Sequence, residues 1–325
     1  MTSNLATDRH VGTATKERAT RDVRTENTTA KPNNTVSVVL ALLAVYIIWG
    51  STYFAIRITL ESFPPFLMAG IRFLLAGGIL FTYLKVRGAP MPNLKQWGAS
   101  TLVGCLLLLG GNGLVTFAEQ WVASGLAALA VATMPLFAAL FAGLWGRWPR
   151  KMEWAGLALG FVGVILLNLE GDMRANPLGA FALLVAAASW ALGSVWSHYL
   201  PLPGGMMASA TEMLGGGAAL LVVGLLSGEH MTVFPETGPT LAFFYLVIFG
   251  SIVAFSAYSY LLQKVRPTLS TSYAYVNPAV AVALGVWLGG ELVTWVGLVA
   301  MPVILVGVGI VVLGASREGR ASRRS

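Results

Sequence analysis

The stretch Pro267–Leu288, PTLSTSYAYVNPAVAVALGVWL, decides how the rest of the chain is organised. It carries no charge, is long enough to cross a bilayer, and has Pro278 at its centre. A proline there removes a backbone donor and frees the carbonyl of Ala274, which needs another partner at membrane depth. Polar residues precede the proline: Ser270, Thr271, Ser272, Tyr273, Tyr275 and Asn277. We therefore expect an apolar helix with a polar wall, interrupted at Pro278.

A second stretch repeats this pattern 143 residues earlier. The apolar run 124–145 has Pro135 in its middle, and the same offset aligns Gln120 with Gln263. The chain is thus expected to contain the element twice, with Pro135 and Pro278 as the two helix breaks.

The composition predicts an all-α integral membrane protein. Apolar residues are 56% of the 325 residues and charged residues 11%, against about 25% charged in soluble proteins. The net charge of +7 comes from Lys and Arg in tails and short loops, which indicates topology signals and no nucleic-acid partner. A single cysteine, Cys105, excludes an internal disulfide framework.

Ten apolar runs have spanning length. They are 36–56, 66–84, 97–118, 124–145, 153–169, 177–197, 206–226, 240–262, 268–288 and 295–315. We divide them into repeats at 36–170 and 177–315, between a disordered tail at 1–35 and a basic tail at 316–325. Gly50-Ser51 matches Gly193-Ser194 at the 143-residue offset. Because five spans is an odd number, the second copy should be inverted, as in transporters that work by alternating access.

The distribution of basic residues predicts that both termini are cytoplasmic. This orientation places eighteen of the 21 Lys and Arg residues inside, with only Arg57 and Arg174 outside and Arg72 within the membrane. The acidic residues Glu119 and Glu291 are then assigned to the outer side.

Arg72 in the second span and Glu212 in the seventh are the charges most clearly at membrane depth. Aligning LMAGIRFLLAGG with MASATEMLGGG puts them at equivalent positions in the two copies. Such charges are a functional hypothesis by default, and a structural ion pair or snorkelling to an interface is the alternative. Pairing with Arg72 would keep Glu212 ionised, which disfavours proton coupling through Glu212.

Aromatic and small polar side chains on five spans are candidates for a substrate pocket. Trp and Tyr rings offer faces to an organic substrate, and an amide or hydroxyl can fix its orientation. Ordinary helix packing is the alternative for the small residues. The candidates are Trp49, Ser51 and Tyr53 in the first span, Asn112 in the third, Trp190 in the sixth, Tyr258 in the eighth, and Tyr275 and Asn277 in the ninth.

The sequence does not support an enzyme, a metal site or a cofactor. His10 lies in the tail and His198 and His230 lie in or beside loops, so no two histidines have ligand spacing on one helix. No phosphate-binding motif of the GxxxxGK type is present. Any transport should therefore be secondary or facilitated.

Five segments resemble those of a known family. They are WGSTYFAIR (49–57), PPFLMAGIRFLLAGG (64–78), EWAGLALGFVGVILLN (153–168), SWALGSVW (189–196) and SYAYVNPAVAVALG (272–285). On these motifs, residues 38–315 resemble EamA-type transporters of the drug/metabolite transporter superfamily, and most of all their YedA-like branch in the bacterial inner membrane. Met134 stands before Pro135 where the second copy has Asn277 before Pro278, so the copies contribute unequally to any site.

The resemblance implies a ten-helix inverted-repeat fold with both termini cytoplasmic. It also implies a central cavity lined by the first, third, fourth, sixth, eighth and ninth helices, and export of drugs or small metabolites such as amino acids. Nucleotide-sugar and sugar-phosphate transporters share the fold but need several cations for phosphate, and this membrane region offers Arg72. A non-transporting membrane sensor or scaffold is the other alternative. Expected partners are a small-molecule substrate and membrane lipid, with the chain a monomer or homodimer.

Overall fold

The structure is a computed structural model that describes residues 34–144, 146, 148–149, 151–167, 176–231, 234–264, 273–292 and 294–321. These residues form helices and loops without any β-strand. The chain divides into two units, Met1–Val39 and Leu40–Ser325. The predicted tail at 1–35 lies outside the described residues except for its last two positions. The other predicted tail, at 316–325, begins within a helix that continues to Ala321.

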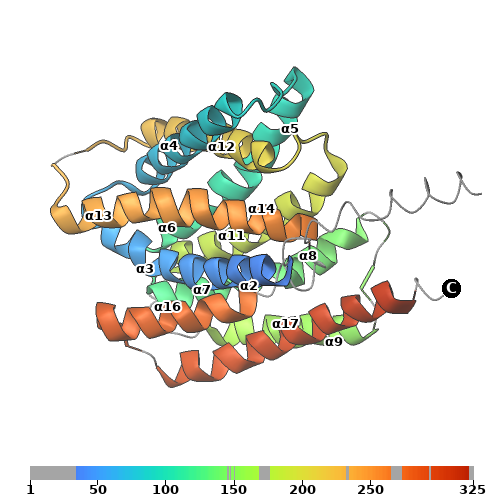
Figure 1. Cartoon of the computed structure of the whole chain (residues 1–325). Coiled ribbons are helices and arrows are strands. Elements are labelled where there is room, and N and C mark those ends of the chain that lie inside the picture. The colour runs from blue at the N-terminus through green and yellow to red at the C-terminus, as the bar shows by residue number, and fades with distance from the viewer. Residues whose placement is uncertain are drawn as a thin grey trace, which may run out of the picture. The chain divides into compact units, whose positions relative to one another are not determined.

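Eighteen helical elements cover the described residues (Figure 1). In the first half of the chain they are α2 (Asn34–Ala44), η2 (Val45–Trp49), α3 (Gly50–Thr59), α4 (Pro65–Val86), α5 (Leu94–Gly104), η3 (Cys105–Gly113), α6 (Leu114–Ala118), α7 (Ser124–Val131), α8 (Met134–Gly143) and α9 (Lys151–Leu167). In the second half they are α11 (Pro177–Trp196), η4 (Ser197–Tyr199), α12 (Met206–Leu226), α13 (Thr237–Tyr245), η5 (Leu246–Val253), α14 (Ala254–Lys264), α16 (Tyr273–Gly289) and α17 (Trp295–Ala321).

Seven of the described helical stretches are long and apolar enough to cross a membrane, which confirms the membrane class. They are Val36–Thr59, Pro65–Val86, Leu94–Ala118, Ser124–Gly143, Pro177–Tyr199, Met206–Leu226 and Thr237–Tyr258. Shorter apolar helices, Trp154–Gly163, Val276–Gly289 and Trp295–Gly307, lie where the other three spans were predicted.

Small residues allow the helices to approach closely, as is usual in membrane proteins. A Cβ added to Gly77 of α4 would lie 2.9 Å from the Cβ of Met213 in α12, and one added to Gly307 of α17 would lie 2.7 Å from the Cα of Gly160 in α9. Figure 1 shows these two pairs side by side, α4 with α12 and α9 with α17.

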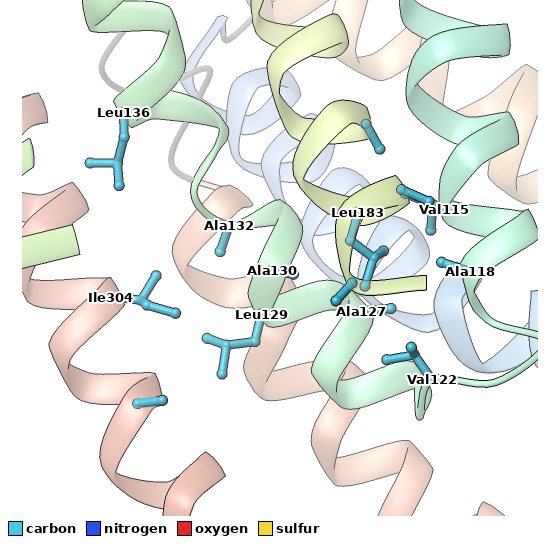
Figure 2. Packing of buried hydrophobic residues seen from close by; sticks show 14 of the residues in the cluster. Val115, Ala118, Val122, Ala127, Leu129, Ala130, Ala132, Leu136, Leu183 and Ile304 are labelled. Atoms are coloured by element: carbon cyan, nitrogen blue, oxygen red, sulfur yellow. The ribbon is translucent and has the colours of Figure 1, made fainter. Parts of the chain in front are cut away.

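An apolar cluster joins α6, α7, α8, α9, α11 and α17 (Figure 2). Leu129 of α7 and Ile304 of α17 point into the space between their helices, while Leu183 of α11 packs on the other side of α7. Alanines fill most of the remaining positions, so the backbones stay close together. This cluster holds the two-part span α7–α8 against the second half of the chain.

The two predicted helix breaks differ. Pro135 does interrupt its span, because α7 ends at Val131 and α8 begins at Met134, with Pro135 in the first turn where no backbone donor is needed. Pro278 does not, since α16 continues through it from Tyr273 to Gly289, so this prediction was wrong. The flanking helices α3 and α7 pack against α16, and such neighbours allow a membrane helix to tolerate a proline.

Candidate functional site

A large pocket lies among helices from both halves of the chain, with about 730 Å³ of space not filled by protein atoms, part of it open to solvent. Its walls come from η2, α3, η3, α6, α7, α8, α11, α14 and α16, with one side chain from α4. The lining residues are Trp49, Thr52, Tyr53, Ile56, Arg72, Gly111, Asn112, Val115, Ala128, Val131, Ala132, Met134, Ala186, Trp190, Phe255, Tyr273, Asn277 and Pro278. Most of this surface is apolar, and a few polar groups are placed within it, as in small-molecule sites.

The structure brings together six of the ten residues suggested by sequence. Trp49, Tyr53, Arg72, Asn112, Trp190 and Asn277 line the pocket. Ser51, Glu212 and Tyr258 are not among its lining residues, and the side chain of Tyr275 lies outside the part of the chain that is described. Of the two prolines, Pro278 lines the pocket and Pro135 does not.

Trp49 is the centre of the aromatic wall. Its ring lies 5.0 Å from Tyr258, 5.1 Å from Tyr273 and 5.4 Å from Phe255, centroid to centroid, and Trp190 lies 6.0 Å away, edge on. Its indole N–H donates to the carbonyl of Gly250 at 3.1 Å, as a buried Trp requires. Tyr258 therefore supports the pocket from behind Trp49.

Arg72 supplies the positive charge of the pocket. Its side chain is 2% exposed, its Nε donates to Ser251 Oγ at 2.9 Å, and its guanidinium carbon lies 4.7 Å from the centroid of the Phe73 ring. Its Nη1 has no hydrogen-bond partner. A buried guanidinium with a free donor facing a pocket is suited to hold a carboxylate or another anionic group.

Two amide side chains, Asn112 and Asn277, line the same pocket. The Oδ1 of Asn112 is buried without a partner, so it remains available to accept from a ligand. Asn277, with its amide nitrogen turned toward the helix, donates to the carbonyls of Tyr46 and Tyr273, each at 3.2 Å. The carbonyl of Tyr273 lies one turn before Asn277, so the Asn277 side chain bonds to the backbone of its own helix in the turn before Pro278.

Arg72 and Glu212 do not form an ion pair. Arg72 turns toward Ser251, whereas the charge of Glu212, on α12, acts on Tyr258. Within the described ranges the one ion pair joins Arg57 and Glu291. Ser51 has a structural role as well, since its hydroxyl shares a 2.6 Å hydrogen bond with the Tyr245 hydroxyl and donates to the carbonyl of Ile48.

Three π-helical segments, which the sequence analysis did not predict, position the site. Trp49 ends η2, Gly111 and Asn112 lie in η3, and Gly250 and Ser251 lie in η5. Each extra residue in a turn changes which side chains face the pocket, and such segments are frequent at functional sites. Gly111 also lets α11 come close, because a Cβ there would lie 2.7 Å from the Trp190 ring.

Glu119 is a residue whose burial the sequence did not predict. It was assigned to the outer side together with other acidic residues; it is 3% exposed, and neither of its carboxylate oxygens has a hydrogen-bond partner. It follows the last residue of α6, one turn beyond Val115 of the pocket. Residue type gave no signal for this burial. Within the described part of the chain, no three His, Cys, Asp or Glu side chains form a group that could hold a metal ion.

Comparison with known proteins identifies relatives over nearly the whole chain. The model of the EamA-like transporter family matches residues 36–169 and 177–313. The chain is 50% identical over 275 residues to the uncharacterized inner membrane transporter YedA of Escherichia coli strain K12, covering 84% of this chain and 90% of YedA. It is 26% identical over 288 residues to a probable amino-acid metabolite efflux pump of Salmonella typhimurium, covering 85% and 94%. A crystal structure of a protein 23% identical in sequence shares the fold, with a TM-score of 0.62 over 85% of this chain and 98% of that chain.

Proposed function

The chain belongs to the EamA-like transporter family of the drug/metabolite transporter superfamily, and from this membership we propose that it is a secondary transporter of the bacterial inner membrane. It exports small metabolites, amino acids or related compounds among them, by alternating access. Ten helices cross the membrane as two inverted repeats, with both termini in the cytoplasm.

The observation that carries the proposal is a pocket between the two halves whose buried polar groups lack partners. The Nη1 of Arg72 and the Oδ1 of Asn112 are both unpaired and both line it. Native proteins rarely leave such groups unsatisfied, so an unpaired donor and an unpaired acceptor beside one cavity indicate a polar ligand. A carboxylate on Arg72 and a donor on Asn112 would satisfy both, with the rest of the substrate against the aromatic wall.

The pattern of helix contacts supports two inverted copies. The first and ninth predicted spans pack together as α3 with α16, and their counterparts in the other copy, the sixth and fourth, pack as α11 with α8. The pairs α4 with α12 and α9 with α17 join each predicted span to its own counterpart. The π-helical segments η3 and η5 begin at Cys105 and Leu246, 141 residues apart. A pseudo-twofold relation between the halves accounts for all three observations.

Phosphate-bearing substrates fit the pocket less well. Among the described residues that line it, Arg72 is the one cation, and recognition of a phosphate group commonly uses several charged donors. This favours a substrate with one carboxylate over a nucleotide sugar or sugar phosphate.

A thermal-shift screen of the purified protein tests the proposal. Amino acids, nucleosides, sugars and lipophilic cations are added separately, because a ligand of the folded state at a hundred times its Kd contributes about 2.7 kcal/mol. We expect stabilisation by amino acids that is lost in Arg72→Met. Saturable flux of the stabilising compound in proteoliposomes would then separate a transporter from a sensor or scaffold, and an absence of flux with every class would refute the proposal.

A further inference from the structure

Glu119 has a buried carboxyl group that does not line the proposed substrate pocket. Both oxygens are inaccessible and lack any donor. Glu291, a few residues beyond α16, differs in this respect. Its carboxylate accepts from the Ser124 N–H at 3.0 Å, the Ser124 hydroxyl at 2.8 Å and the Gly125 N–H at 3.3 Å, at the start of α7. It also lies 3.6 Å from Arg57. The protein thus provides donors for one carboxylate and none for the other.

Position distinguishes Glu119 further. It stands between the pocket, one turn away at Val115, and the end of the helices where α3 and α16 finish and α7 begins. Arg57, at this end, has a side chain that is 45% exposed. Glu119 therefore lies between the pocket and this end of the helices, which is the outer end in the proposed topology.

The charged and titratable groups that act on Glu119 come from three directions. Tyr53 and Arg57 belong to α3, Arg72 to α4, and Glu291 follows α16. Glu119 lies one residue beyond the apolar span Leu94–Ala118. Burial is the main cause that raises the pKa of its carboxyl well above the ordinary value, and the charge of Glu291 raises it further, against the lowering effect of Arg57 and Arg72.

We propose that Glu119 is the proton-binding site of the transport cycle, and that this end of the bundle closes only when Glu119 is protonated. The inference rests on the proposed function and deepens it by naming the coupling ion. With Glu119 buried as the structure shows, an ionised carboxylate would be a buried charge without donors, which is costly, whereas the neutral acid is tolerated. Ionisation therefore favours opening, because water can then solvate the carboxylate.

Closing of the outer end upon protonation of Glu119 has the direction that a proton-coupled exporter needs. A proton from the outer solution neutralises Glu119 and allows the outer end to close. When the pocket then faces the cytoplasm, release of the proton through the pocket leaves Glu119 ionised, which favours reopening of the outer end. The carboxyl group gains and loses one proton per cycle, and proton entry is exchanged for substrate exit. Carboxylates buried in transporters commonly have this role.

Labelling of a pocket cysteine tests the proposal without any substrate. Cys105 is the only cysteine, so Cys105→Ser provides a cysteine-free background. Ile56→Cys, a pocket-lining position beside Arg57, is then labelled in intact bacterial cells with a membrane-impermeant maleimide at several external pH values. Glu61→Cys, exposed at the end of α3, is labelled in parallel to correct for the reactivity of the thiol and to test the topology.

We expect the corrected labelling rate to rise with pH, by at most about tenfold per unit for a single proton. Glu119→Gln, a neutral isostere, should keep the rate low at every pH. Glu236→Gln, which removes an exposed carboxylate, should retain the wild-type response. An equal pH response in Glu119→Gln and the wild type would overturn the proposal.

An infrared titration gives a second readout if Ile56→Cys fails to fold. The carbonyl band of a protonated carboxylic acid should titrate in the wild type and lose one component in Glu119→Gln. An unchanged band would refute the proton site.

Flux is measured separately, so the two proposals can fail independently. Flux without a pH-dependent labelling rate would support the transport proposal and refute proton coupling through Glu119. Titration of Glu119 without flux would support Glu119 as a proton-binding site and refute the transport proposal.

Discussion

Two adjacent glycines of α4 allow a matched test of how the two halves of the chain are joined. A Cβ on Gly77 would lie 2.9 Å from Met213 Cβ, 3.1 Å from the carbonyl oxygen of Ala210 and 3.1 Å from the backbone nitrogen of Leu214, all in α12. A Cβ on Gly78 would have no atom within 4 Å. Gly77→Ala therefore tests the contact with α12, and Gly78→Ala is its control.

The expected difference follows from two opposing effects. Replacing a helical glycine by alanine gains about 0.8–1 kcal/mol of helix propensity at either position. At Gly77 the atoms in the way are mostly backbone and cannot rotate aside, so α4 and α12 must separate by a few tenths of an ångström. Overpacking of this kind costs about 1–3 kcal/mol. We expect Gly77→Ala to be about 1–3 kcal/mol less stable than Gly78→Ala.

Reversible unfolding in mixed micelles, followed by tryptophan fluorescence, measures this difference. The comparison is made between the two variants, so detergent effects cancel. Equal stability would show that α4 and α12 are not in backbone contact in the membrane, and would refute the packing on which the pseudo-twofold argument depends.

Three further outcomes are expected. Glu229→Gln removes the charged cap of α4, where the carboxylate accepts from the Leu67 N–H at 2.8 Å, and should lower the free energy of unfolding by about 0.5–2 kcal/mol; an unchanged unfolding curve would contradict this. Trp49→Phe keeps most ring contacts but deprives the Gly250 carbonyl of its donor, and should cost about 1–3 kcal/mol; equal stability of the variant in the same assay would show that the bond is dispensable. Because burial raises the pKa of Glu119, the folded state binds this proton more tightly than the unfolded state, whose pKa is about 4.3. Wild-type stability should therefore fall relative to Glu119→Gln as the pH rises from about 4.3 toward the raised pKa, by up to about 1.4 kcal/mol per unit, and parallel pH profiles would refute the shift.

Features of the fold that depend on hydrophobicity and length could be predicted from the sequence. Apolar runs and the scarcity of charge gave the membrane class, and motifs such as those around Arg72 and Asn277 gave the family. The effect of each proline was harder to predict, because Pro135 and Pro278 have the same local pattern. What separates them is the surrounding packing, and a single sequence does not show which neighbours will support a helix after it loses one hydrogen bond.

The candidate site could be predicted in part. Aromatic and amide side chains such as Trp49 and Asn112 are conspicuous in an apolar span, and the structure places them in one pocket. Ser251 and the π-helical segments were missed, because a single inserted residue changes the facing side chains without any change in composition. The pairing of Arg72 with Glu212 was suggested because the two residues occupy equivalent positions in the aligned copies. An alignment gives the position of a residue along a helix but not the direction in which its side chain turns.

The asymmetry between the copies has a consequence for the cycle. If the halves are inverted copies, the states open at either end use equivalent helix contacts, so the backbone contributes little to the free-energy difference between them. That difference then depends on residues without a like counterpart. Arg72 aligns with Glu212 in the motif alignment given above. Glu119 aligns with Leu262 at the 143-residue offset. Moving a two-state equilibrium from 1:99 to 99:1 takes about 5.5 kcal/mol. A carboxyl contributes about 1.4 kcal/mol for each unit by which its pKa differs between the two states, so the proton at Glu119 could drive the whole switch alone only if that pKa differed by about four units.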